Sequence, residues 1–81
     1  MPTFERITHN PAVMGGKPCI RGMRVTAGAI LGLLAIGRKP EEILAAYPYL
    51  ETDDIPAVLS YAAWRLEERE AALPRDRKSV V

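Results

Sequence analysis

The sequence has little of what supports covalent, redox or metal chemistry, since its 81 residues include one cysteine and one histidine. One cysteine cannot form an internal disulfide, so a reducing cytoplasm is the expected compartment. Residues 1–10 lack an apolar core, and we expect no secretory signal. The longest apolar run, Val25–Ile36, is too short to cross a bilayer. We therefore expect a soluble cytoplasmic protein.

The residue types that carry catalysis are scattered along the chain. Cys19 and His9 have no activating partner near them in sequence, and their spacing is not that of a zinc site. The Gly-Gly-Lys-Pro stretch at 15–18 lacks the glycine spacing and the Lys-Ser/Thr pair of a phosphate-binding P-loop. The acidic pairs at 41–42 and 53–54 suit helix N-termini and need no catalytic role. We expect no enzyme, cofactor or metal.

Composition is that of one small globular domain, with 48% apolar and 26% charged residues. A chain of this size buries a modest share of its surface, and association with a partner often adds stability. The charged residues are unevenly distributed along the sequence. Residues 1–40 hold six basic residues and one acid, whereas residues 41–81 hold five basic residues and nine acids. This polarity indicates an anionic partner for the first half, although a solvated surface also explains it.

Turn and capping residues divide the chain into a ribbon and three helices. Arg21-Gly22 favours a tight reversal inside a small hairpin or extended ribbon at residues 17–25, with glycine at positive φ. The elements are a β-ribbon over about 4–25, which includes a short strand at 4–7, and helices over about 26–36, 40–47 and 53–73. They form one domain, 1–73, followed by a tail, 74–81.

Each helix has a start signal in the sequence. Thr26 is a credible N-cap of the first helix and Gly37 its C-terminal stop. Pro40 suits the first turn of the second helix, and Thr52 is placed to cap the third. Three helices with short connections give a helix-turn-helix outline, which is also compatible with bundles that never contact nucleic acid.

The first helix is apolar almost all round and must be covered on more than one side. Gly28 and Gly32 lie four residues apart on it, which predicts that another backbone packs closely there. The third helix has two apolar faces at 100° per residue. The core face holds Ile55, Val58, Leu59, Ala62 and Leu66, whereas Ala57, Tyr61 and Trp64 lie on another side.

Tyr61 and Trp64 on this second side, together with Gly28 and Gly32, predict a protein interface, and a homodimer is its most economical form. The alternative is that Trp64 covers the N-terminal ribbon. In the tail, Val80 and Val81 suggest a docking role, against a plain frayed terminus.

One ordered set of residues runs along most of the chain: Ile7, Pro11, Val13, Gly16-Lys17-Pro18, Ile20, Gly22 and Arg24-Val25, then Gly37, Pro40-Glu41-Glu42-Ile43, Tyr47-Pro48-Tyr49-Leu50 and Asp53-Asp54-Ile55. This pattern resembles bacterial domain-of-unknown-function family 433. One departure is Met23, where the family usually has threonine.

This resemblance implies a homeodomain-like helix-turn-helix fold behind a short β-element, in a dimer. It also implies an antitoxin that binds and neutralises a PIN-like ribonuclease toxin, and that binds its own promoter DNA. The second hypothesis is a small dimeric interaction or scaffold module with no nucleic-acid binding.

The residues themselves place DNA binding on the ribbon rather than on the third helix. The N-terminus of the third helix is acidic, and a phosphate backbone would repel it. The predicted DNA-binding residues are therefore Lys17, Arg21, Arg24, Arg38 and Lys39. A two-stranded ribbon from a dimer would fit the major groove. The alternative is that Arg21 and Arg24 pair with acids of the second half.

Overall fold

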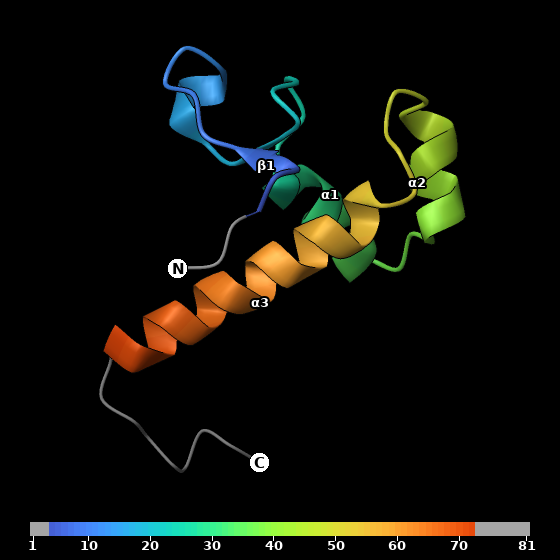
Figure 1. The fold of residues 1–81 in the computed structure, drawn as a ribbon. Coiled ribbons are helices and arrows are strands. Elements are labelled where there is room, and N and C mark those ends of the chain that lie inside the picture. Colours follow the sequence, from blue (N-terminus) through green and yellow to red (C-terminus); the bar gives the residue numbers. More distant parts are fainter. Residues whose placement is uncertain (1–3, 73–81) are drawn as a thin grey trace, which may run out of the picture.

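The chain folds as a small, mainly helical domain behind a two-stranded ribbon, and this predicted fold class is confirmed (Figure 1). The computed structural model describes residues 4–72. The elements are β1 (Ile7–Thr8), the 3-10 turn η1 (Met14–Gly16), β2 (Cys19–Ile20), α1 (Ala27–Ala35), α2 (Pro40–Ala46) and α3 (Asp54–Ala72). Each helix agrees with its predicted range to within a residue at either end. Within residues 4–72, no helix has the length and apolar character needed to span a membrane.

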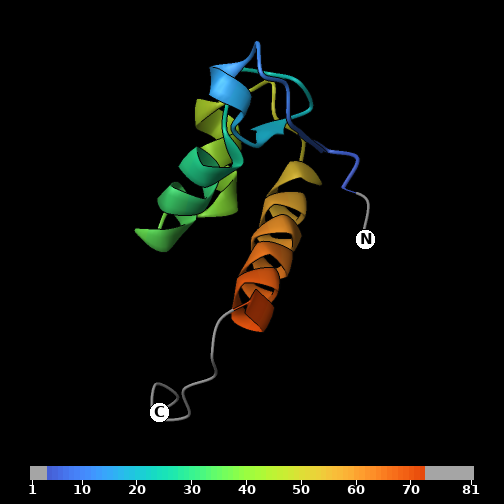
Figure 2. The ribbon, with the colours of Figure 1, turned by 90° about the vertical axis from the view of Figure 1, so that its left-hand side faces the viewer.

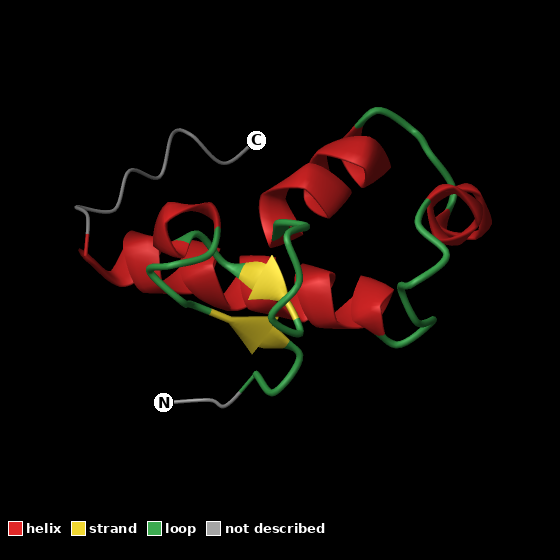
Figure 3. Cartoon of the chain, turned by 90° about the horizontal axis from the view of Figure 1, so that it is seen from above, coloured by secondary structure: helices red, strands yellow, loops and turns green. Residues whose placement is uncertain are grey.

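The ribbon pairs β1 with β2 in antiparallel fashion, with Ile7 opposite Ile20 (Figure 3). The predicted reversal at Arg21-Gly22 is confirmed. Arg21 and Gly22 have φ of 47° and 75°, and the N–H of Met23 donates to the Ile20 carbonyl over 2.9 Å. Two central residues at positive φ suit the right-handed twist of a hairpin. The expected strand at 4–7 is wrong in its bounds, because pairing starts only at Ile7.

Local capping rules account for most helix ends. The hydroxyl of Thr26 accepts from the N–H of Ala29 over 3.0 Å, and Gly37 follows α1 with a φ of 96°. The carboxylate of Glu42 accepts from the N–H of Lys39 at the start of α2. At α3, the carboxylate of Asp54 accepts from the N–H of Glu51 over 2.8 Å. The structure places Asp54, rather than the predicted Thr52, in this capping bond.

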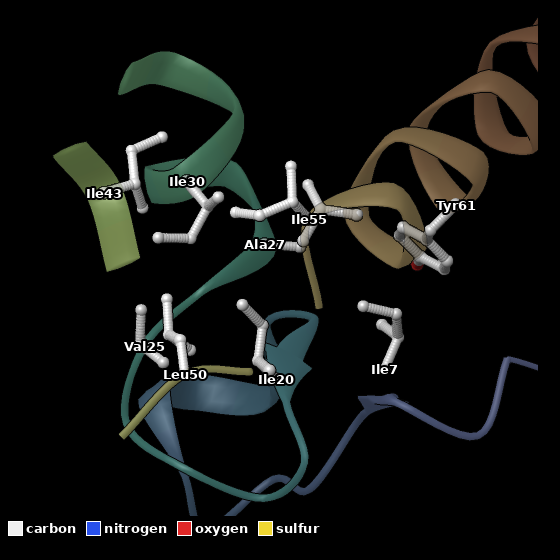
Figure 4. Packing of buried hydrophobic residues seen from close by; sticks show 10 residues of the cluster. Ile7, Ile20, Val25, Ala27, Ile30, Ile43, Leu50, Ile55 and Tyr61 are labelled. Atoms are coloured by element: carbon white, nitrogen blue, oxygen red, sulfur yellow. The ribbon is translucent and has the colours of Figure 1, made fainter. Parts of the chain in front are cut away.

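The core forms where the ribbon meets the three helices. α1 contacts both α2 and α3, and β1 contacts α3. Figure 4 shows Ile7 and Ile20 of the ribbon facing the side chains of α1 and α3. Full burial of one such side chain is worth about 1.5–3 kcal/mol. The buried cluster consists of Ile7, Ile20, Val25, Ala27, Ile30, Ile43, Leu50, Ile55, Val58 and Tyr61.

The predicted faces of α3 are partly wrong. Tyr61 was expected to point away from the core, but only 6% of it is exposed. Leu59 and Leu66 were expected in the core, and they are 46% and 65% exposed. The reason is that the ribbon, as well as α1, covers α3. The buried stripe therefore follows Ile55, Val58 and Tyr61 at a spacing of three residues.

Candidate interaction surfaces

A fully buried carboxylate joins the ribbon to α3. Asp54 accepts two hydrogen bonds from Arg21, one from Nε over 3.1 Å and one from Nη2 over 2.9 Å. Nη1 of Arg6 donates to the same carboxylate over 2.9 Å and to Glu51 over 2.8 Å. Arg21 also donates to the carbonyl of Tyr49 over 3.0 Å. Two arginines of the first half therefore hold the loop before α3 and its first residue.

These contacts set the protonation of Asp54. Burial alone would raise the pKa of this carboxyl group. The hydrogen bonds from Arg21, from the Glu51 N–H and from Arg6 outweigh burial and lower the pKa to about 2. The hydrogen bond with Asp54 in turn raises the pKa of Arg21. Asp54 is therefore ionised and paired at neutral pH.

The network separates Arg21 from the other predicted DNA-binding residues. Arg21 is half-buried and paired with an acid of the second half, which was the alternative reading of its role. Lys17, Arg24, Arg38 and Lys39 are exposed, and no carboxylate in the described part of the chain pairs with them. The sequence did not reveal Arg6 as a partner of Asp54, because 48 residues separate the two.

The four exposed basic residues lie in two places. Nη1 of Arg24 is 3.8 Å from the sulfur of Met14, and the N–H of Lys17 donates to the carbonyl of Met14. Lys17 and Arg24 therefore flank one turn of the ribbon. Arg38 and Lys39 lie in the loop between α1 and α2, at the opposite end of α2 from the loop that leads to α3 (Figure 1).

A surface hollow of about 440 Å³ lies beside the ribbon reversal, and we call it the ribbon hollow. It is lined by Gly22, Met23, Arg24 and Tyr49. Tyr49 is 52% exposed, and its ring meets that of Tyr47 edge to face at a centroid distance of 6.0 Å. The hollow thus combines an exposed aromatic ring with a cation that pairs with no carboxylate of the described residues.

The residues of the predicted aromatic interface pack within the domain. The Trp64 ring lies 5.5 Å from that of Phe4 and 5.8 Å from that of Tyr61, between centroids. The hydroxyl of Tyr61 is hydrogen bonded to Nε2 of His9 over 2.9 Å. Trp64 is half-buried and contacts Phe4, in the segment that leads into the ribbon. This agrees with the alternative that Trp64 covers the N-terminal ribbon. An additional contact of Trp64 with a partner stays a prediction.

An apolar groove of about 290 Å³ runs between α1 and α3. Figure 2 shows α1 close to α3 at its beginning and diverging from it toward its C-terminal end. The α1 side carries no charged residue, and the exposed Leu66 lies on the α3 side. The groove brings together two residues of the predicted interface, Gly28 and Tyr61. Its lining is Pro18, Ala27, Gly28, Leu31, Val58, Tyr61, Ala62, Arg65 and Leu66.

The glycines of α1 do not mediate packing within the described residues. A Cβ atom added at Gly28 or Gly32 would meet no atom within 4 Å, and both positions are exposed. No backbone of the described residues therefore packs closely against these two glycines. Their role in an interface with another molecule stays a prediction. Val80 and Val81, the other predicted interface residues, lie outside the described residues.

The lone cysteine and the possible metal ligands form no reactive cluster within residues 4–72. Cys19 is a buried thiol in β2. Residues 4–72 contain no group of three His, Cys, Asp or Glu side chains placed to hold a metal ion.

Residues 7–62 match the family described as "Protein of unknown function (DUF433)", which is more than half of the chain. The chain belongs to the DUF433 family. It is 34% identical, over 58 residues, to the uncharacterized protein y4eO of Sinorhizobium fredii (strain NBRC 101917 / NGR234). That match covers 72% of this chain and 26% of the relative, so the chain spans about a quarter of the length of y4eO.

A solved structure shares the fold. The crystal structure of a DUF433 member from Anabaena variabilis ATCC 29413 superposes with a TM-score of 0.73 at 31% sequence identity. The superposition covers 85% of this chain and 70% of the other. The arrangement of ribbon and helices is therefore shared by another DUF433 member.

Proposed function

We propose that this DUF433 chain is a non-enzymatic, antitoxin-like cytoplasmic protein that binds and neutralises a PIN-like ribonuclease toxin. The observation that carries the proposal is the apolar groove between α1 and α3, where a helix without charged residues borders an exposed leucine, Leu66. Exposed apolar surface of this kind marks sites of protein interaction. The family resemblance supplies the identity of the partner.

The groove suits an apolar segment of a partner protein. Apart from Arg65, its lining is made of uncharged residues, mostly apolar. Ile36, at the end of α1, is 71% exposed and extends the uncharged surface of the helix. A partner helix with apolar residues spaced three and four apart would bury these side chains. Docking of this kind would cover a surface that the fold itself leaves in water.

Two further parts of the proposal concern association with DNA and with a second copy. Binding of promoter DNA would use the exposed basic residues Lys17, Arg24, Arg38 and Lys39, which have no carboxylate partner in the described part. A homodimer would bury the uncharged face of α1 around Gly28. Toxin binding requires neither part, so either part can be disproved while toxin binding stands.

The second candidate is a small dimeric interaction module that does not bind nucleic acid. The pairing of Arg21 with Asp54 favours it, because one predicted DNA contact is already engaged within the fold. The exposed acids Glu51 and Asp53 beside that pair also weaken attraction for phosphates.

Co-expression with the neighbouring genes tests the proposal. The tagged chain is purified from its own operon, and the mass of the intact complex is measured. We expect a stable complex with a small PIN-like ribonuclease. Cleavage of RNA by this ribonuclease should stop when the chain is bound. A homodimer alone, beside a neighbouring ribonuclease that it neither binds nor inhibits, would exclude the antitoxin and favour the interaction module.

A further inference from the structure

Tyr49 is a large aromatic residue that the fold leaves half in water. It is 52% exposed, and the ring of Tyr47 contacts it from one side. Its backbone is fixed nevertheless, because its carbonyl accepts from Arg21 over 3.0 Å and Arg21 is held by the buried Asp54. The buried network thus fixes the backbone that carries this exposed ring, and the ring itself lines the hollow beside the ribbon reversal.

One cation, Arg24, lies beside this ring on the ribbon side, and no carboxylate of the described residues pairs with it. Arg24 lines the ribbon hollow together with Tyr49, and Nη1 of its guanidinium donates to the sulfur of Met14 over 3.8 Å. Lys17 belongs to the same turn, because its N–H donates to the carbonyl of Met14 over 3.3 Å. A hollow of about 440 Å³ is large enough for a nucleotide-sized group.

We propose that the ribbon hollow binds single-stranded nucleic acid, with an unpaired base stacked on Tyr49 and the neighbouring phosphates held by Arg24 and Lys17. This inference goes beyond the promoter-DNA part of the proposed function, because it gives Arg24 and Lys17 a single strand as their ligand in place of a duplex, and it is independent of toxin binding. Aromatic rings that accept bases, next to cations that follow the backbone, are the usual elements of single-strand binding.

The surroundings favour a single strand over a duplex. In a duplex the faces of the bases are covered by their neighbours, so the Tyr49 ring would have no base face to stack on. A duplex also carries twice the phosphate charge per unit length. Glu51 is exposed and lies 3.9 Å from Arg21 of the ribbon reversal, and its charge opposes the denser phosphate array of a duplex more strongly.

Fluorescence anisotropy with the full chain tests the proposal. The probes are a labelled oligothymidine of about twelve nucleotides, within the size range of such sites, and its duplex with oligoadenine. We expect the single strand to bind more tightly. Tyr49→Ala should weaken this binding about tenfold, whereas Tyr49→Phe, which keeps the ring, should bind as the original chain does.

A second measurement, the salt dependence of binding, tests the phosphate contact of Arg24 separately from base stacking on Tyr49. Arg24→Gln should lower the slope of log affinity against log salt by about 0.7, the value for one phosphate contact on a single strand. Glu67→Gln is the control, because it changes one charge at an exposed position of α3 that lines neither the hollow nor the groove, and it should leave the slope unchanged. The side chain of Tyr49 is exposed and its carbonyl remains in every variant, so circular dichroism should show an unchanged fold.

Each other outcome overturns the inference in a recognisable way. Equal or tighter binding of the duplex would leave nucleic-acid binding in place and remove the stacked base. Unchanged binding by a folded Tyr49→Ala variant would remove Tyr49 from the site. Failure of both probes would remove the nucleic-acid part of the function, while the toxin complex is tested separately by co-purification.

Discussion

Nη2 of Arg21 lies 2.9 Å from Oδ2 of Asp54, a carboxylate that has no surface exposed to solvent. Arg21 occupies the ribbon reversal, and Asp54 is the first residue of α3. The pair therefore fixes the ribbon to the third helix across 33 residues of sequence. Because Arg21 also holds the Tyr49 carbonyl, the same contact determines where the ribbon hollow forms.

Asp54→Asn should destabilise the fold strongly. The variant leaves the guanidinium groups of Arg6 and Arg21 beside a neutral amide that accepts fewer hydrogen bonds. Loss of one partner from a buried ion pair typically costs about 3–5 kcal/mol. Urea unfolding followed by circular dichroism measures the free energy of unfolding. Asp53→Asn is the matched control, since its carboxylate is exposed and 3.8 Å from Arg6, and it should change stability by less than about 1 kcal/mol. Equal stability of both variants would contradict the structural role of Asp54.

Stability should fall in acid because of the same carboxylate. The pKa of Asp54 is about 2 in the folded chain and about 3.9 in an unfolded one. Its contribution is therefore complete above the unfolded pKa and is lost as the pH falls from about 4 through 2. The loss should amount to about 2–3 kcal/mol. The measurement is urea unfolding at several pH values, and Asp54→Asn should show a correspondingly shallower acid dependence. Parallel curves for the two chains would show that Asp54 titrates normally.

Local sequence signals predicted the ends of the elements well. Thr26, Gly37 and the Arg21-Gly22 reversal follow from rules that act within four residues, and the structure confirms each. The faces of α3 depend instead on what packs against them. The sequence does not state that β1 and Phe4 lie on α3, so Tyr61 could not be placed in the core.

The candidate site shows the same limit. Five basic residues stood out by charge alone, and the structure separates Arg21 from the others through a partner far away in sequence. Arg24 is exposed, and no carboxylate of the described residues pairs with it. No local pattern distinguishes these two arginines, which are three residues apart on the same reversal.

Charge reversal should therefore affect Arg21 and Arg24 differently. Arg21→Glu places a second carboxylate against the buried Asp54, and the variant should be largely unfolded at neutral pH. Arg24→Glu alters an exposed residue and should remain folded, with nucleic-acid binding weakened or lost. Circular dichroism reports folding, and anisotropy with a labelled strand reports binding. Undiminished binding by a folded Arg24→Glu variant would exclude the ribbon as the nucleic-acid surface.

Trp64→Ala should act first on stability. The substitution removes ring contacts with Phe4 and Tyr61 from a half-buried position, and we expect a loss of about 2–3 kcal/mol. Trp64→Phe keeps a ring there and should lose less than half of that. Thermal unfolding measures stability, and native mass spectrometry measures assembly of the folded fraction. Unchanged stability together with a lost assembly would instead assign Trp64 to an interface.

Leu66→Lys tests the groove between α1 and α3 without disturbing the core. Leu66 is 65% exposed, so the substitution should change the free energy of unfolding by no more than about 0.5 kcal/mol. A lysine there would place its charge against an apolar partner segment and weaken binding of the toxin about tenfold or more. Ser60→Lys is the matched control, because it adds the same charge to an exposed position of α3 that does not line the groove. Binding is measured by titration with the co-purified partner. Equal affinities for both variants would show that the partner docks elsewhere, and loss of binding in both would point to a general effect of charge on α3.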